Sequence, residues 1–324
     1  MKIAFFGSPE IASLLLESII LKRDPSLQIA YIFTQPDQPV GKRLAITATP
    51  VKKMALKHHI PVFDKPLKEN EQEAAAFLKL HEIEVCIVYA YGEILSEKML
   101  TVPSEGYFNV HPSNLPKYRG PTPVAYTLML GEEKTAVSLI KLDKKMDSGP
   151  IIGKIETDIL ATETRSELEV RLTHLATRLI IESLHKIQDR TIRLIEQDKN
   201  EATYTKLLKK EHGYIPQEII QKALSQQSID ADEFPYLLKE YCMKYPQRGI
   251  FHRFTSGELI YNYYRALTPW PGIWTTIQTQ KGEKRLKLTS IQLKDKILIL
   301  NTVQIEGKNE VEFKTFNKAY TIFS

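Results

Sequence analysis

Short apolar runs alternate with amphipathic stretches along the first half of the chain. Residues 2–7, 29–35 and 85–92 are apolar on both faces, which is typical of strands buried in a parallel sheet. Between the first two, the segment 8–20 has Pro9 early in it and Glu10 in its first turn, the pattern of a helix start. The alternation predicts an α/β domain with a Rossmann-like, doubly wound parallel sheet, in which ligands bind at the carboxyl ends of the strands.

A long helix is predicted to close this domain at residues 162–187. Thr164 and Glu167 have the spacing of a capping box at its start. Leucines then repeat at helical spacing, at Leu168, Leu172, Leu175 and Leu179. We therefore expect a first domain that spans residues 1–190.

The pattern changes after this helix. Residues 191–209 are polar and predict a linker. From about residue 274, short alternating runs separated by turn residues predict five or six strands, which suits a small β-barrel of the oligonucleotide-binding (OB) type. The second domain would span residues 210–324, with an insertion of two short helices at about 215–255 to which we assign no function.

Composition and charge narrow the functional classes. With 324 residues, of which 43% are hydrophobic, the chain can bury the cores of two domains. Its net charge of +5 is carried by the residues from Arg265 onward, whereas the preceding residues are neutral overall. A basic terminal domain beside a neutral body indicates an anionic partner such as nucleic acid, the alternative being a solvated basic face.

Targeting and metal-binding patterns are missing from the sequence. The apolar run after Met1 is too short for a signal peptide and no run approaches the length of a membrane span, so we expect a cytoplasmic protein. Cys86 and Cys242 lack CxxC spacing and are expected to be buried, reduced thiols. His58 and His59 are adjacent and would point apart on a helix, so no metal site is predicted. The first strand is not followed by a GxGxxG motif, which argues against a dinucleotide site.

An amide and an imidazole lie two residues apart at the end of the predicted strand 106–111. Because side chains alternate along a strand, Asn109 and His111 should project to the same side. An uncharged amide can donate to a developing oxyanion, and an imidazole can donate or accept a proton near neutrality. The pair therefore predicts a catalytic site at the carboxyl end of this strand.

A carboxylate is still needed to orient the histidine and take up a proton. Asp147 lies in a turn directly before the apolar pair 151–152. Asp143, in the same segment, is the competing candidate. Spacing favours Asp147 but leaves Asp143 open, and an aspartate beside glycine is also common as a plain turn former.

Seven stretches resemble, in order and over nearly the whole chain, those of the methionyl-tRNA formyltransferase family. They are FFGSPEIA, FTQPDQPVGKR, TPVKKMA, YAYGEIL, NVHPSNLPKYRGPTPV, MDSGPI and YYRALTPWPGIWT. The Asn-x-His motif with a downstream Asp is shared by the formyltransferases that use 10-formyltetrahydrofolate. FTQPDQPVGKR and RALTPWPG indicate the tRNA enzymes among them.

The resemblance implies a function and a mechanism. The α-amine of methionyl initiator tRNA would attack the formyl carbon of 10-formyltetrahydrofolate, for initiation of translation. Asn109 and His111 would hold the oxyanion, while Asp147 would pair with His111 and help to remove the ammonium proton. The folate would lie against residues of two loops, namely Tyr91, Gly92, Ile94, Leu95, Ser113, Leu115 and Pro116.

The resemblance also implies contacts with tRNA. The long loop 35–50 would enter the acceptor end of the initiator tRNA, with Lys42 and Arg43 against phosphate or base, unless these are simply exposed charges. The C-terminal domain, including Arg265, would hold the acceptor arm through salt-sensitive contacts. We expect a monomer.

The chain departs from the family pattern in three places. Pro112 and Asn114 stand where the family has other residues after His111, the basic loop is slightly shorter, and the insertion at 215–255 is additional. Because Pro112 has no backbone N–H group, details of the loop could differ while the side chains stay in place.

Two rival functions remain open. A formyltransferase acting on an amino sugar nucleotide would keep Asn109, His111 and Asp147 but would need no basic C-terminal domain. A nucleic-acid-binding protein with an inactive α/β domain would explain the charge but leaves the three polar residues unexplained.

Overall fold

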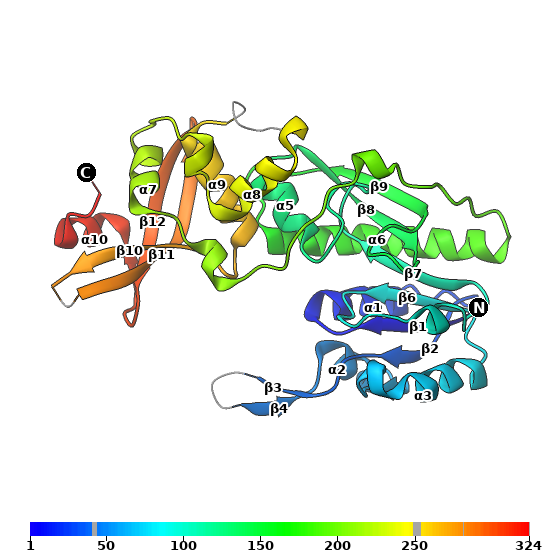
Figure 1. Cartoon of the computed structure of the whole chain (residues 1–324). Coiled ribbons are helices and arrows are strands. Elements are labelled where there is room, and N and C mark those ends of the chain that lie inside the picture. The colour runs from blue at the N-terminus through cyan, green and yellow to red at the C-terminus, as the bar shows by residue number, and fades with distance from the viewer. Residues whose placement is uncertain (41–43, 249–253, 281, 324) are drawn as a thin grey trace. The chain divides into compact units, whose positions relative to one another are not determined.

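The computed structural model describes residues 1–40, 44–248, 254–280 and 282–323 and separates into two compact units (Figure 1). Each unit is assembled from three stretches of chain, so the division does not follow the boundaries at 190 and 210 expected from the sequence. The first unit comprises Met1–Gly120, Lys134–Thr157 and Glu169–Tyr204, and the second comprises Pro121–Glu133, Asp158–Leu168 and Thr205–Ser324.

The first unit is built on a seven-stranded sheet with the order β5-β2-β1-β6-β7-β8-β9. Its strands are β1 (Lys2–Gly7), β2 (Gln28–Phe33), β5 (Val62–Phe63), β6 (Val85–Tyr89), β7 (Gly106–His111), β8 (Lys134–Lys141) and β9 (Ile151–Asp158). The ladders from β5 to β7 are parallel, which confirms the predicted doubly wound sheet. Strand β8 pairs antiparallel with β7, so the sheet is mixed rather than wholly parallel.

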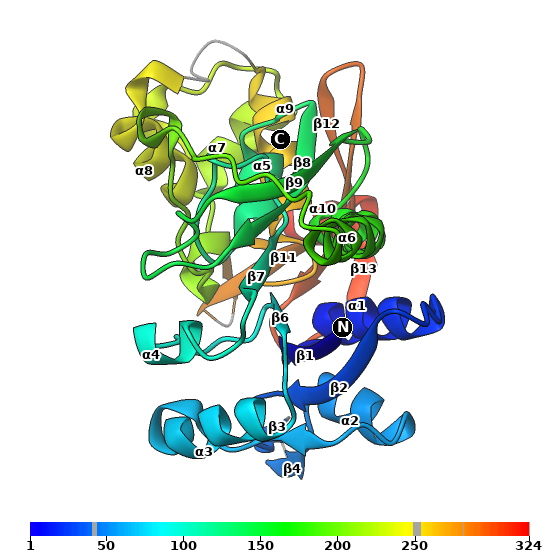
Figure 2. The same cartoon turned by 90° about the vertical axis from the view of Figure 1, so that its right-hand side faces the viewer.

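Helices cover both faces of the parallel strands. They are α1 (Glu10–Leu21), α2 (Pro50–Lys57), α3 (Leu67–Leu80), α4 (Glu97–Leu100) and the long α6 (Arg165–Gln188). Figure 2 shows α1 and α2 on one side of β1 and β2, with α3 and α4 on the other. Beside them lie a two-stranded ribbon, β3 (Gln38–Val40) and β4 (Ala45–Thr47), and the 3₁₀ turn η1 (Lys199–Glu201).

Aromatic rings fill one face of this sheet. Phe6 on β1 stacks on Phe33 of β2 with ring centres 4.3 Å apart. Tyr91 and Tyr107 meet the edge of Phe6 at 5.3 and 5.4 Å. Offset and edge-to-face pairs add to the free energy gained by burial, so these rings fix the separation of strands that carry the site at their ends.

The second unit combines helices with an antiparallel sheet of order β10-β11-β12-β13. Its helices are α5 (Pro123–Met129), α7 (Gln217–Leu224), α8 (Tyr236–Lys244), α9 (Ser256–Leu267) and α10 (Phe313–Tyr320), with 3₁₀ turns η2 (Lys210–Gly213), η3 (Ala231–Glu233) and η4 (Pro246–Arg248). Its strands are β10 (Ile273–Thr279), β11 (Gly282–Lys294), β12 (Ile297–Ile305) and β13 (Glu310–Glu312).

Two details of the second unit differ from the sequence-based expectation. The described residues form four strands in this sheet, where the alternation predicts five or six. Helix α5 lies against α9, so a segment assigned to the first domain by its position in the sequence packs with the C-terminal half. The two short helices expected at 215–255 are present as α7 and α8.

The start of α6 shows one of the two bonds of the predicted capping box. The Thr164 backbone N–H donates to the Glu167 carboxylate at 2.8 Å, and the Thr164 hydroxyl donates to the same carboxylate at 2.7 Å. These bonds lower the pKa of Glu167.

None of the helices in the described part of the chain is both long enough and apolar enough to cross a membrane.

Both thiols should be unreactive in the native protein. Cys86 is 0% and Cys242 2% exposed, and neither is in a disulfide. Burial also raises the pKa of the Cys86 thiol well above its ordinary value, and the thiolate is the nucleophile. A disulfide reagent such as DTNB should therefore label neither thiol until denaturant is added. Rapid labelling of the native protein would contradict this burial.

Candidate active site

Strand β7 presents Asn109 and His111 at the carboxyl end of the parallel sheet. In the ladder with β8, Asn109 is opposite Ile140 and His111 is opposite Ser138. The two residues are separated by one buried position, Val110, and therefore project to the same side of the strand. The side chain of His111 is 4% exposed, so its ring works in a largely water-free environment.

The carboxylate of Asp147 lies against both side chains. Asn109 Nδ2 donates to Asp147 Oδ1 at 3.2 Å, and His111 Nδ1 is 3.6 Å from Asp147 Oδ2. The backbone N–H of Gly120 donates to the same Oδ2 at 2.7 Å. An amide, an imidazole and a backbone N–H therefore converge on one carboxylate that is 11% exposed.

The hydrogen bond on the far side of the imidazole determines which nitrogen is free for chemistry. His111 Nε2 lies 2.9 Å from the backbone oxygen of Tyr118. A carbonyl oxygen can only accept, so Nε2 carries a proton. Nδ1 is then the nitrogen that faces Asp147, 3.6 Å from Oδ2.

Asp143, the competing candidate, lies outside this cluster. Its carboxylate accepts hydrogen bonds from the Ser148 hydroxyl at 2.9 and 3.0 Å and from the backbone N–H of Lys145 at 2.9 Å. Those bonds close the exposed turn between β8 and β9. The geometry therefore favours Asp147 as the partner of His111.

Gly149 lets this loop lie close to β8. A Cβ atom built on Gly149 would lie 1.9 Å from the backbone oxygen of Lys141, which is far inside any contact distance. Only glycine fits at this point. The close approach places Asp147 two residues before a rigid attachment to the sheet.

Two polar residues behind Asp147 were missed by sequence reasoning. Gln197 lies in the segment 191–209 that was predicted to be a linker, yet it is 8% exposed and its amide donates to the backbone oxygens of Asp147 and Gly149. Arg119, 3% exposed, donates to the oxygen of that amide. A single glutamine in a polar stretch carries no periodic signal, and its partner lies 78 residues away in the chain.

The predicted folate-binding residues of the loop after β6 differ in their exposure. The Tyr91 ring packs in the hydrophobic core, 2% exposed, so its side chain does not line a surface site. Leu95 is partly buried against the same core, and Ile94 is 93% exposed. Gly92 has φ +87°, which glycine adopts readily.

The other predicted folate-binding residues follow His111. Ser113 and Leu115 are 0% and 1% exposed, and the Ser113 hydroxyl donates to the backbone oxygen of Lys117 at 2.8 Å. Both side chains thus shape the loop from inside, while Pro116 is partly buried. Lys154 Nζ donates to Asn114 Oδ1 at 2.6 Å and to the Leu115 backbone oxygen at 2.7 Å, which gives the unusual Asn114 a role in holding the loop.

The prediction that Arg265 binds tRNA needs correction. It is 6% exposed, and its guanidinium donates to the backbone oxygens of Leu160 and Glu163 and to Asn262 Oδ1. Burial lowers the pKa of this group. Arg265 therefore holds the second unit together from inside instead of presenting its charge to phosphate. Lys42 and Arg43 lie outside the described residues.

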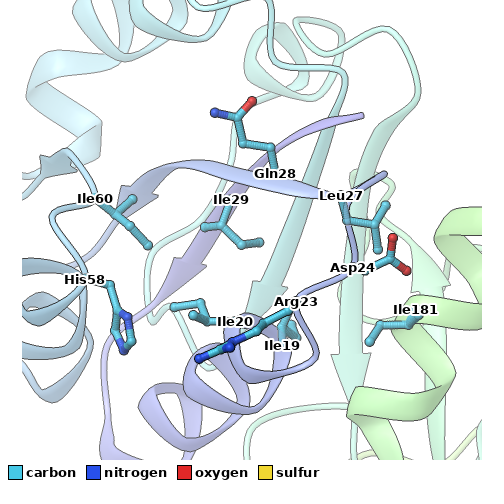
Figure 3. Close-up of a pocket in the computed structure, with 10 residues that line it drawn as sticks. All are labelled: Ile19, Ile20, Arg23, Asp24, Leu27, Gln28, Ile29, His58, Ile60 and Ile181. Carbon is cyan, nitrogen blue, oxygen red and sulfur yellow. The ribbon is translucent and has the colours of Figure 1, made fainter.

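The first unit also has a cavity of about 280 Å³ (Figure 3). None of the predicted site residues lines it. Gln28, at the amino end of β2, lines it, together with aliphatic side chains such as Ile19 and Ile60 and the ring of His58. Strands β2 and β7 run in the same direction in one sheet, with β1 and β6 between them. The cavity is at the amino ends of these strands, whereas His111 is at the carboxyl end. Among the described residues, no group of three His, Cys, Asp or Glu side chains is placed to hold a metal ion.

Comparison with known proteins shows the family. The formyl transferase model matches residues 1–184. A methionyl-tRNA formyltransferase from Kosmotoga olearia is 33% identical over 288 residues, which is 89% of this chain and 78% of that protein. The chain belongs to the methionyl-tRNA formyltransferases. The enzyme of that name from Thermotoga maritima is 42% identical over 211 residues, which spans 65% of this chain and 66% of the relative.

Solved structures share the fold of this formyltransferase over most of its length. The methionyl-tRNA formyltransferase from Clostridium thermocellum superposes with a TM-score of 0.55 at 17% identity, covering 96% of this chain and 99% of that one. An N-formyltransferase from Helicobacter canadensis, solved in complex with folinic acid and dTDP-3-aminofucose, gives a TM-score of 0.55 at 16% identity, covering 94% and 95%. At these identities the likeness supports the fold alone.

Replacing the two aspartates one at a time should separate their roles. Asp147→Asn removes the charge that faces His111, so we expect kcat for formyl transfer to fall roughly 10²- to 10⁴-fold, the usual contribution of a positioned acid or base. Asp143→Asn, a matched change in the same loop, should leave kcat within about threefold of wild type. Steady-state kinetics of both variants would test this assignment, and equal losses in the two would contradict it.

Proposed function

We propose that this formyltransferase transfers the formyl group of 10-formyltetrahydrofolate to the α-amino group of methionyl initiator tRNA, for initiation of translation. The convergence of Asn109, His111 and Asp147 at the carboxyl end of β7 carries the proposal. Family membership supplies the co-substrate, since formyltransferases of this kind use formyl-tetrahydrofolate.

The geometry suggests how each group acts. The α-amine attacks the formyl carbon, and the new C–N bond gives a tetrahedral intermediate with an oxyanion. One amide proton of Asn109 is directed to Asp147, which leaves the second to donate to the oxyanion. Since His111 Nε2 is engaged with the Tyr118 carbonyl, Nδ1 is the nitrogen that serves the reaction. Asp147 and Nδ1 take the ammonium proton, the bond to the folate nitrogen breaks, and that nitrogen receives a proton.

The folate would lie between the two predicted loops. Because the Tyr91 ring is turned into the core, this residue and Gly92 would contact the pterin through backbone groups, with Ile94 and Leu95 beside them. Ser113, Leu115 and Pro116 would shape the opposite loop from beneath. The structural neighbour solved with folinic acid supports this class of ligand for the fold.

A partly exposed group of aromatic and basic residues on the second unit is a better candidate for tRNA contact than the buried Arg265. The Arg285 guanidinium stacks 4.6 Å from the centre of the Trp274 ring, whose neighbour Tyr214 lies at 5.0 Å. Lys287 is opposite Trp274 in the β10–β11 ladder. Cations neutralise phosphates and flat rings stack on bases, so this aromatic–basic face has the chemistry of nucleic-acid binding.

The remaining parts of the proposal, which are the loop contacts with tRNA, the cellular location and the oligomeric state, follow from the proposed function. Lys42 and Arg43 remain predicted tRNA contacts. A cytoplasmic location follows from a role in translation initiation, and a monomer is expected. Transfer to an amino sugar nucleotide is the alternative, for which the Helicobacter neighbour is a match in fold.

The decisive experiment is formyl transfer to charged initiator methionyl-tRNA compared with charged elongator methionyl-tRNA. We expect transfer to the initiator alone, weakened at high salt. Asn109→Ala should lower kcat by a factor of about 10² to 10³, the effect of losing one oxyanion donor, roughly 3 to 4 kcal/mol. Its melting temperature should match that of wild type. Transfer to an amino sugar nucleotide in place of tRNA would overturn the proposal.

The aromatic–basic face can be tested through the salt dependence of tRNA binding. Arg285→Gln and Lys287→Gln should each raise KM for tRNA and reduce the slope of log K against log salt by about one, as expected for a lost phosphate contact. KM for folate should not change. Lys314→Gln, which removes an exposed charge on α10 of the same unit, is the control. Equal effects from all three would show a general charge effect with no particular face involved.

A further inference from the structure

We propose that Gln197 is a positioning residue that holds the Asp147 loop in its reactive geometry. The inference rests on the roles proposed above for Asn109, His111 and Asp147, and extends them to a side chain from the segment that was predicted to be a linker. Gln197 does not touch the reacting atoms; it acts through the backbone on either side of the carboxylate.

Both amide protons of Gln197 are used on this loop. Nε2 donates to the backbone oxygen of Asp147 at 2.9 Å and to that of Gly149 at 2.7 Å. The two carbonyls flank Ser148, so one planar group fixes the relative orientation of two peptide units. Gln197 as a whole residue is 8% exposed, so water does not compete freely for these carbonyls.

The orientation of the amide is determined by chemistry on its other side. Gln197 Oε1 accepts from Arg119 Nε at 3.1 Å and from Nη2 at 2.8 Å. A guanidinium can only donate, so the amide oxygen must face Arg119 and the NH₂ group must face the loop. Arg119 is in turn anchored by its own backbone N–H, which donates to the Thr203 oxygen at 2.8 Å.

Asp147 needs such an anchor because its backbone is strained. Its φ of +49° lies in the left-handed region, which is unfavourable for a residue with a Cβ atom. The preceding residues 143–146 are exposed, and of these the Asp143 carboxylate binds the hydroxyl of Ser148, the residue that follows Asp147. Strained conformations persist only where surrounding contacts over-determine them, and the Gln197 amide supplies two of those contacts.

Losing the two donors should let the loop relax. The carboxylate would then move away from His111 Nδ1 and from the Gly120 N–H that binds it at 2.7 Å. Displacement of a catalytic group by about 1 Å can cost roughly 10²-fold in rate. Substrate binding should be preserved, because Gln197 lies behind the loop.

Gln197→Glu is the sharpest test, because it separates the two sides of the amide. A glutamate keeps the shape and still accepts from Arg119, but it cannot donate to the Asp147 and Gly149 carbonyls. We expect kcat to fall about 10- to 100-fold while KM for both substrates stays within about twofold. Gln292→Glu, at an exposed position of β11, is the charge-matched control and should behave as wild type.

A merely structural role gives a different result. If Gln197 only anchors Arg119, Gln197→Glu should retain full kcat, whereas Gln197→Met should lower the melting temperature. A positioning role predicts that kcat falls in both variants and that the melting temperature of Gln197→Glu stays near that of wild type. A kcat of Gln197→Glu within threefold of wild type would overturn the inference.

A double-mutant cycle with Asp147→Asn tests whether Gln197 acts through the carboxylate. If it does, adding Gln197→Glu to Asp147→Asn should cause little further loss, because the carboxylate that it positions is already disabled. Fully additive losses would overturn the inference. If Asp147→Asn itself had no effect, the assigned catalytic roles would fail instead.

Amide exchange gives a readout that does not depend on activity. In wild type the Gly120 N–H is protected by the Asp147 carboxylate, so its exchange, followed by NMR, should accelerate in Gln197→Glu and stay unchanged in Gln292→Glu. Unchanged protection in Gln197→Glu would overturn the inference even if tRNA proved not to be the acceptor. Absence of transfer in wild type would count against the proposed function alone.

Discussion

The carboxylate of Asp147 is the point on which the rest of the site depends, because it joins the loop before β9 to strand β7 and to the loop that follows β7. Asn109 and His111 come from β7, and the Gly120 N–H from the loop that follows. A carboxylate that accepts several hydrogen bonds in a nearly buried position is well defined in space. Strand, loop and carboxylate therefore act as one unit, and each restricts the motion of the others.

Much of this arrangement could be predicted from local pattern. Period-two alternation places Asn109 and His111 on one side of a strand, and apolar runs locate the parallel sheet that carries it. Spacing favoured Asp147 but left Asp143 open, because both lie in one turn and only the folded backbone determines which carboxylate faces His111. Gln197 could not be found at all, since its importance comes from tertiary contacts with Asp147 and Gly149.

The positions of the surface charges were the part of the structure that the sequence predicted least well. A surplus of cations predicts an anionic partner, but it does not tell which cations reach the surface. Arg265 lies in the last turn of α9, where the amphipathic pattern turns it inward to donate to the backbone oxygens of Leu160 and Glu163. Arg285 and Lys287, which share one side of β11 because side chains alternate along a strand, are partly exposed.

The choice of an amide as the anchor for Asp147 has a physical advantage over a charged side chain. A lysine at position 197 could donate to the same two carbonyls, but its ammonium would bring a positive charge close to the carboxylate and would compete with His111 for it. A neutral amide holds the backbone without altering the electrostatic balance between Asp147 and His111. Arg119 fixes the Gln197 amide by donating two charged hydrogen bonds to its oxygen. The loop is therefore held firmly, although the group that contacts it is neutral.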